Sequence, residues 1–186
     1  TDSIVLAWGR FNPPTTGHEK LINAVVSEAK KRAADYRIYP TKSTDPKKNP
    51  LTFKEKVRFM RKMFPRHARK ISSDEGINTL IKAVQKLEAE GYKNLTLLAG
   101  SDRINEFKTL LNKYNKKDYT FDSINVVSAG ERDPDAEDVS GMSASKMRDA
   151  ASKGDFASFR KGVPVAKIAK PLYDAVRKGM KVNEQF

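Results

Sequence analysis

Short apolar runs alternate along this chain with longer segments in which apolar residues recur every three or four positions. Continuous apolar runs between turn residues are typical of buried strands, and they occur at residues 4–8, 36–39, 94–100 and 123–130. A shorter run at Ile71-Ser72 is a weaker strand candidate. Amphipathic spacing predicts helices at residues 20–34, 52–64, 77–87 and 104–111. After Ser143 the pattern is helical to the end, with breaks expected at Gly154, residues 162–164 and Pro171.

Individual residues predict where some of these helices start or end and which face of the first helix is buried. Thr52 and Glu55 have the spacing of a capping box at the start of the second helix, and Gly91 is expected to close the third. One face of the first helix is expected to be buried, and its members are Ile22, Val25, Val26, Ala29 and Ala33.

Strand–helix alternation predicts an α/β fold in which a parallel sheet is covered by helices on both faces. Because crossovers are right-handed, the expected topology is a doubly wound sheet, which binds ligands beyond the carboxyl ends of its strands. We expect residues 1–150 to form this core and residues 151–186 to form a helical segment packed on it.

Composition narrows the class of protein. The chain has 186 residues, no cysteine and a net charge of +13, so disulfide and thiolate metal sites are excluded and anionic partners are favoured. No apolar run is long enough to span a bilayer and no secretory leader is visible, although the chain starts at Thr1 and a leader could have been removed. We therefore expect a cytoplasmic protein with no membrane partner. The composition does not indicate an oligomeric state.

The positive charge is concentrated in one segment. Residues 42–70 carry eleven Lys and Arg against two acidic residues, Asp45 and Glu55. This segment is either a solvated helical face or the wall of a site for phosphate or nucleic acid.

The loop after the first predicted strand, "GRFNPPTTGH" at residues 9–18, combines features of a turn and of a phosphate site. Gly9 allows a sharp turn, and Thr16 with Glu19 predicts a capping box for the following helix. Gly17 lets a ligand approach the helix N-terminus, which favours phosphate, and His18 adds donors. The alternative is an ordinary capped helix with a surface histidine.

Two further loops follow predicted strands, and we expect all three loops at one edge of the sheet. Residues 141–148, "GMSASKMR", come after an acidic loop at residues 130–138. Their Ser143, Ser145, Lys146 and Arg148 could clamp a polyphosphate or simply start a helix.

The remaining loop, "AGSDR" at residues 99–103, combines Gly100 with Asp102. Asp102 could cap the next helix, or it could hold a substrate hydroxyl or a metal-bound water.

Together the three loops resemble the signatures of the nucleotidyltransferase superfamily, which has a Rossmann-like α/β core. "GRFNPPTTGH" is similar to its Gly-x-Phe-x-Pro…His/Thr-x-Gly-His signature, and "MSASKMR" to its Ile-Ser-x-Thr/Ser-x-x-Arg signature. "LLAGSDR" and "NPLTFKEKVRFM" resemble two further segments of that superfamily. Met142 stands where the superfamily has Ile, and Thr15 stands in the first His/Thr position. The resemblance covers about residues 3–150 and looks closest to the nicotinamide-mononucleotide adenylyltransferases.

This resemblance implies that an acceptor phosphate attacks the α-phosphorus of a nucleoside triphosphate and releases pyrophosphate, without an enzyme nucleophile. His18 and Thr15 would act at the α-phosphate, while Ser143, Ser145 and Arg148 would hold the β- and γ-phosphates. The resemblance implies the catalytic residues His18, Thr15 and Arg148. The other substrate-binding positions would be Gly9, Phe11, Gly17, Gly100, Asp102 and Lys146. Arg10 and Lys42 are expected as extra contacts because they follow the ends of predicted strands.

Magnesium would bridge the phosphates with few protein ligands, so no metal-binding residue is assigned. The resemblance favours ATP over CTP, and it makes nicotinamide mononucleotide the leading phosphorylated small-molecule acceptor. The alternative is a catalytically inactive protein of the same fold that binds nucleotides or nucleic acid or has a structural role. The sequence contains neither Gly-Lys nor Gly-x-Gly-x-x-Gly, which argues against P-loop kinases and dehydrogenases.

Overall fold

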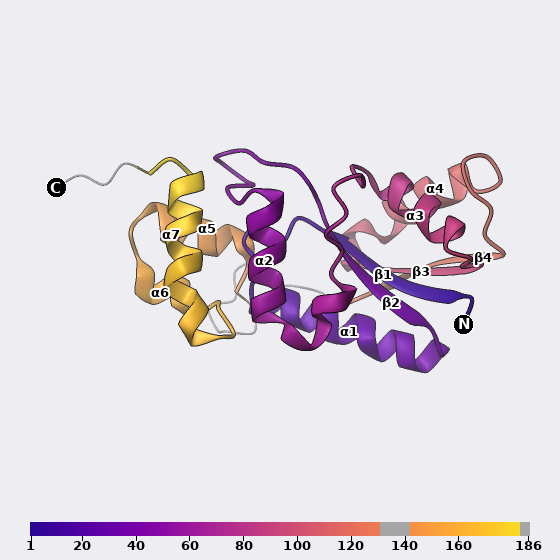
Figure 1. Ribbon diagram of the computed structural model, residues 1–186, viewed down its shortest axis with the longest axis horizontal. Helices are drawn as coiled ribbons and strands as arrows, with labels where there is room; N and C mark the ends of the chain where they lie inside the picture. Colours follow the sequence, from indigo (N-terminus) through magenta and orange to yellow (C-terminus); the bar gives the residue numbers. More distant parts are fainter. Residues whose placement is uncertain (131–141, 183–186) are drawn as a thin grey trace. The chain divides into compact units, whose positions relative to one another are not determined.

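The structure, a computed structural model, describes residues 1–130 and 142–182 (Figure 1). The chain divides into two compact units. We call the first the sheet unit; it comprises Thr1–Gly9, Leu21–Tyr39 and Asp74–Glu131. We call the second the helical unit; it comprises Arg10–Lys20, Pro40–Ser73 and Arg132–Phe186. The predicted boundary near residue 150 stays a prediction.

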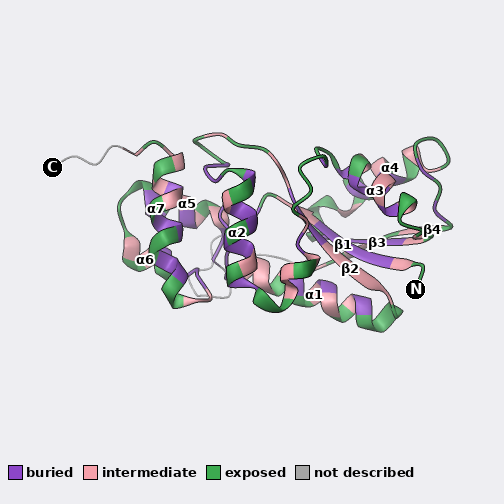
Figure 2. Ribbon diagram, in the orientation of Figure 1, coloured by how far each residue is buried: buried purple, intermediate pink, exposed green. Residues whose placement is uncertain are grey.

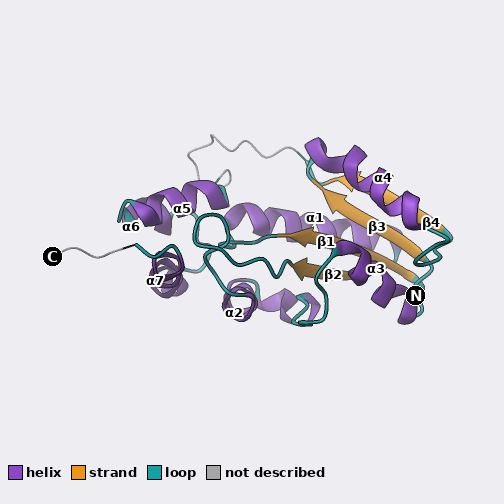
Figure 3. Cartoon of the chain, turned by 90° about the horizontal axis from the view of Figure 1, so that it is seen from above, coloured by secondary structure: helices purple, strands orange, loops and turns teal. Residues whose placement is uncertain are grey.

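Four strands form the sheet in the order β2-β1-β3-β4. They are β1 (Ser3–Gly9), β2 (Asp35–Pro40), β3 (Asn94–Ala99) and β4 (Ser123–Ser128). The pairs β1–β3 and β3–β4 are parallel, and the arrow of β2 points the same way as that of β1 in Figure 3. The chain moves outward from β1 to β2 and then crosses to β3 on the other side of β1, which confirms the doubly wound topology. The strand candidate at Ile71-Ser72 is wrong, because Ile71 is a single bridge residue after a 3₁₀ helix and neither residue belongs to a strand.

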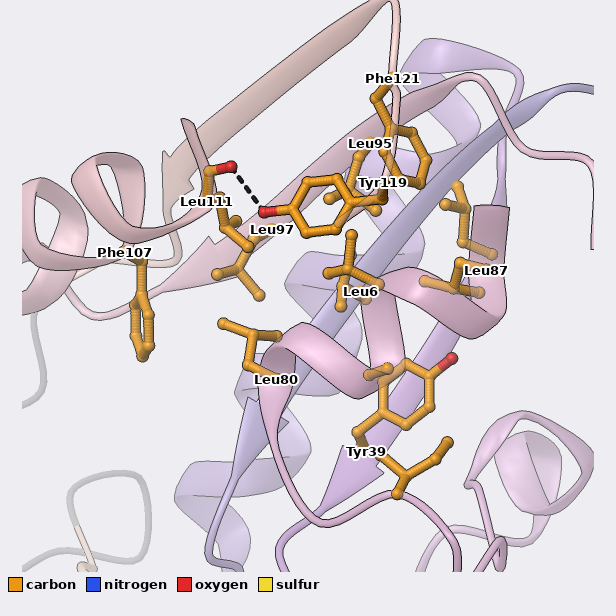
Figure 4. Packing of buried hydrophobic residues seen from close by; sticks show 14 of the residues in the cluster. Leu6, Tyr39, Leu80, Leu87, Leu95, Leu97, Phe107, Leu111, Tyr119 and Phe121 are labelled. Carbon is orange, nitrogen blue, oxygen red and sulfur yellow. Dashed lines mark hydrogen bonds between the residues drawn. The ribbon is translucent and has the colours of Figure 1, made fainter. Parts of the chain in front are cut away.

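Alternate residues of the central strands form the core of the sheet unit (Figure 4). Ile4 and Leu6 of β1 lie in one apolar cluster with Leu95 and Leu97 of β3. This cluster includes the inner faces of α3 (Leu80–Ala89) and α4 (Ile104–Tyr114). Figure 1 shows those two helices on one side of the sheet and α1 (Thr16–Arg32) on the other.

The predicted buried face of α1 is correct for its first four members but wrong for Ala33. Ile22, Val25 and Ala29 are buried and Val26 is half-buried. Ala33 is exposed, because α1 ends at Arg32 and the chain turns left-handed at Ala33 with φ 51°. The periodic pattern thus continues one residue past the helix.

The helical unit contains α2 (Phe53–Met63), α5 (Ala144–Ser152), α6 (Phe156–Arg160) and α7 (Ala169–Gly179). It also contains the short 3₁₀ segments Pro65–Lys70 and Ala166–Ile168. The predicted capping box of α2 is confirmed, with Thr52 and Glu55 each bonded to the backbone of the other. Figure 2 shows α2 with one buried face and one exposed face.

Aromatic side chains join the C-terminal helices of this unit. The rings of Phe156 and Phe159 meet that of Tyr173 edge-on, at centroid distances of 5.1 and 5.3 Å. The predicted break at Pro171 is wrong: Pro171 lies in the first turn of α7, where a missing N–H costs no helical hydrogen bond. Within residues 1–130 and 142–182, no helix is both long enough and apolar enough to cross a membrane.

The close approach of α7 to the loop before α2 gives a stability prediction. A Cβ added at Gly179 would lie 1.9 Å from the carbonyl oxygen of Pro50, which is backbone and cannot rotate away. We expect Gly179→Ala to lower the free energy of unfolding by about 1–3 kcal/mol, measured by denaturant titration. Lys178→Ala, at an exposed position of the same helix, is the matched control and should leave stability almost unchanged. Equal stability of Gly179→Ala and the wild type would contradict this packing.

Candidate active site

Thr15 caps the N-terminus of helix α1. Its hydroxyl oxygen accepts hydrogen bonds from the backbone N–H groups of Gly17 (3.1 Å) and His18 (3.4 Å). Its carbonyl oxygen accepts from the N–H of Glu19 at 3.1 Å. The capping box predicted for Thr16 and Glu19 is therefore wrong by one residue, and the N–H of Thr16 donates instead to the carbonyl oxygen of Gly162 at 2.9 Å.

His18 completes this cap with its side chain. The backbone N–H of Thr15 donates to Nδ1 of His18 at 3.0 Å, which is the part that a glutamate plays in a capping box. A ring nitrogen that accepts a hydrogen bond carries no proton, so the neutral imidazole holds its proton on Nε2. The ring also packs against Phe11, with centroids 4.7 Å apart and an interplanar angle of 55°. Both contacts fix the orientation of the imidazole.

The turn before this helix is buried and bonded to a distant segment. Phe11 is 1% exposed and has a left-handed backbone with φ 48°, an uncommon conformation for a residue other than glycine. Asn12 is completely buried; its amide donates to the carbonyl oxygen of Leu51 (3.1 Å), and its side-chain oxygen accepts from the Leu51 N–H (2.9 Å). No sequence signal pointed to Asn12, because its partner lies 39 positions away.

Arg148 joins the last signature to the first. Its guanidinium donates to the carbonyl oxygen of Asn12 at 2.9 Å, across 136 positions of sequence. The prediction that Ser143 starts a helix is confirmed, since its hydroxyl caps α5 by accepting from the N–H of Lys146 at 3.1 Å. Ser143 is buried, Lys146 and Arg148 are half-buried, and Ser145 is exposed. Two of the three predicted loops are therefore in contact in the helical unit.

The third predicted loop belongs to the sheet unit. The register of β1 and β3 pairs Ala7 with Leu98, so Gly9, the last residue of β1, and Gly100, the residue after β3, lie at neighbouring strand ends. Asp102 lies in a 3₁₀ turn and does not cap α4, whose N-cap is Arg103 without a side-chain hydrogen bond. The predicted role of Gly100 and Asp102 in substrate binding stays a prediction.

The remaining predicted positions are placed as follows. Lys42 is a half-buried residue just after β2, and Arg10 is an exposed residue just after β1. Apart from Gly130, the predicted acidic loop at residues 130–138 lies outside the described residues. The described part of the chain holds no cluster of three or more acidic or histidine side chains that could bind a metal ion.

One charged residue that the sequence did not single out is Lys56. It lies in the first turn of α2, its side chain is completely buried, and its ammonium donates to the Thr41 hydroxyl at 3.4 Å. Burial, and then the positive charge of Arg10, lower the pKa of Lys56 to about 8. The charged ammonium therefore makes the folded chain less stable below about pH 8. This penalty disappears as the pH rises toward the ordinary lysine pKa of 10.5.

The loop between Thr41 and Lys56 is held by an aspartate turn. Asp45 accepts from the side-chain amide of Asn49 at 2.8 Å and from the backbone N–H of Lys48 at 2.7 Å. These bonds, led by that of Asn49, lower the pKa of Asp45 to about 2, so the turn persists at neutral pH.

Residues 6–150 match a family model described as cytidylyltransferase-like. The chain belongs to the cytidylyltransferase-like family. This membership places it in the nucleotidyltransferase superfamily, as the signatures predicted, and the matched range contains every predicted site residue. None of the curated proteins matches this cytidylyltransferase-like chain.

The fold is similar to a solved structure of a bifunctional NMN adenylyltransferase/ADP ribose pyrophosphatase from Francisella tularensis. The TM-score is 0.62 at 11% sequence identity, and the similarity covers 97% of this chain. It covers 53% of the Francisella tularensis protein, so this cytidylyltransferase-like chain spans about half the length of that protein. At this identity the likeness concerns the fold, and it confirms the predicted Rossmann-like class.

Proposed function

We propose that this chain transfers AMP from ATP to a phosphate-bearing small molecule and releases pyrophosphate. The observation that supports this most directly is the state of His18. Its Nδ1 accepts the Thr15 N–H, which holds the ring at the N-terminus of α1, where backbone N–H groups and the helix dipole favour a phosphate.

In the proposed reaction, an oxygen of the acceptor phosphate forms a bond to the α-phosphorus of ATP. The bond between that phosphorus and the oxygen bridging to the β-phosphate breaks, and pyrophosphate leaves with the electron pair. The Nε2–H of His18 donates to an α-phosphate oxygen and stabilises the negative charge that develops there. Thr15 keeps the ring in the donating tautomer through its backbone N–H.

The leaving pyrophosphate requires positive charge and hydrogen-bond donors. In this proposal Arg148 and Lys146 supply the charge, and Ser143 and Ser145 supply hydroxyls at the start of α5. ATP enters as its magnesium complex, in which the ion neutralises phosphate charge. Lys42, which follows the end of β2, is an additional contact of the triphosphate in this proposal, and Arg10, which follows the end of β1, is a contact of the acceptor phosphate.

The choice of ATP rests on the form of the first signature and on the adenylyltransferase named for the similar fold. Nicotinamide mononucleotide is the first acceptor to test on the same grounds. The second candidate function is nucleic-acid binding without catalysis. It is favoured by seven exposed cations in the segment 42–70, namely Lys47, Lys48, Lys54, Arg58, Lys62, Arg66 and Arg69.

A panel assay separates the two functions. Each of the four ribonucleoside triphosphates is incubated with magnesium and with nicotinamide mononucleotide, other nucleoside monophosphates or a sugar phosphate, and pyrophosphate is measured. We expect release that needs both substrates and is fastest with ATP. No release with any pair, together with nucleic-acid binding that weakens steeply with salt, would favour the second function.

A further inference from the structure

One cation in the basic segment 42–70 does not fit the explanation of a solvated face. Seven of its eleven Lys and Arg residues are exposed, and Lys56 is the one that is completely buried. Removing an ammonium from water is costly unless the charge is paired and hydrogen-bonded. The position of Lys56 therefore requires a reason other than solubility.

The residues that the structure describes provide a hydrogen-bond acceptor for only one of the donors of this ammonium. A lysine ammonium has three donors, and the one hydrogen bond it makes to the described residues is that to the Thr41 hydroxyl at 3.4 Å. No carboxylate lies within ion-pair distance of it among residues 1–130 and 142–182. The nearby charge is that of Arg10, which has the same sign.

The local backbone also opposes a cation at this position. Lys56 is the fourth residue of α2, next to the N-terminus, where the helix dipole stabilises negative charge. Burial, the like charge of Arg10 and the helix dipole therefore all act against Lys56 when no ligand is present. An anion next to Lys56 would offset these three unfavourable effects.

We propose that Lys56, together with the Thr41 hydroxyl and the Arg10 guanidinium, binds the phosphate monoester of the acceptor. A phosphate monoester carries a charge of about −1.5 to −2 at pH 7 and three acceptor oxygens, which matches two cations and a hydroxyl. Arg10 is exposed and Thr41 is half-buried, so in this proposal the anion approaches the buried ammonium of Lys56 from the side of these two residues. This inference rests on the proposed function, because it assigns the acceptor within that reaction.

The assignment separates the two substrates by their protein elements. Apart from Lys42, the proposed triphosphate contacts come from the start of α1 and the start of α5. The three acceptor contacts come from the residue after β1, the residue after β2 and the first turn of α2. Lys56 is thus a specificity-determining residue for the phosphate of the acceptor and not for ATP.

The test is thermal unfolding of the full chain at pH 7 with inorganic phosphate as the probe, titrated in the presence of saturating ATP. We expect phosphate to raise the Tm of the wild type. The affinity for phosphate should be about 10- to 100-fold lower in Lys56→Met than in the wild type. Without ligands, the same variant should have a higher Tm than the wild type, because the buried charge is gone. Lys54→Met, an exposed position in the same turn, is the matched control and should behave as the wild type.

Thr41→Val is the second variant, in case Lys56→Met does not fold. It removes one hydroxyl at a half-buried position, and we expect a loss of several-fold in phosphate affinity with an unchanged response to ATP. A phosphate response in Lys56→Met equal to that of the wild type, or no response in the wild type, would overturn the assignment. The Tm shift caused by ATP and the release of pyrophosphate test the proposed function separately.

Discussion

Replacing His18 with alanine should lower the turnover number for pyrophosphate release by about 10²- to 10³-fold. The variant loses the Nε2–H donor that we place at the α-phosphate, where negative charge develops in the transition state. It also leaves the backbone N–H of Thr15 without its partner at 3.0 Å, which should cost about 1 kcal/mol of stability. Turnover and denaturant unfolding, measured on the same preparation, separate these two losses.

His18→Glu distinguishes catalysis from capping more sharply. A glutamate at this position can accept the N–H of Thr15 as in an ordinary capping box, so the helix start should be retained. Its carboxylate repels phosphate, so activity should fall at least as far as in the alanine variant. His67→Ala, which removes the other histidine of the chain, should keep wild-type turnover. Full turnover in His18→Ala would contradict the role of the imidazole.

Replacing Arg148 with methionine should lower kcat/KM for ATP by about 10²- to 10³-fold. The guanidinium is the cation of α5 that contacts the first signature directly, through the carbonyl oxygen of Asn12 at 2.9 Å. Its loss should weaken the stabilisation of the leaving pyrophosphate and should remove the hydrogen bond to the buried turn. Steady-state kinetics with ATP varied at saturating acceptor measure the effect.

Two matched variants test this assignment of Arg148. Arg148→Lys keeps the charge but loses the planar, two-pronged geometry, so we expect only partial recovery of kcat/KM. Lys153→Met removes a cation from the same stretch of chain, where the side chain is 70% exposed, and should change little. If Arg148→Met and Lys153→Met had the same small effect, Arg148 would not be a ligand of the triphosphate.

The strands and most helices could be predicted because each depends on neighbouring residues. Apolar runs marked the four strands, and Thr52 with Glu55 marked the start of α2 correctly. The predicted N-cap of α1 was wrong by one residue, because Thr15 and Thr16 are adjacent. Thr16 and Glu19 have the spacing of a capping box, although Thr15 is the residue that caps the helix. In the structure His18 takes the position that the pattern assigned to glutamate.

The omission of Asn12 has a physical cause, which is its dependence on distant parts of the chain. Asn12 is held by Leu51, and the carbonyl oxygen of Asn12 is held by Arg148, at separations of 39 and 136 positions. Lys56 lies in a segment where most cations are solvated, so composition gave no reason to expect its burial. Asp102 has the residue type of an N-cap, but the chain forms a 3₁₀ turn there and α4 begins later.

The central claim is that the site around His18 transfers a nucleotidyl group between phosphates. The most direct measurement quantifies pyrophosphate and adenylylated product in one reaction, with ATP, magnesium and the best acceptor of the panel, for wild type and His18→Ala. The account predicts equal amounts of the two products and a rate that is at least about 100-fold lower in the variant. Release of inorganic phosphate in place of pyrophosphate, or equal rates for the two proteins, would contradict it.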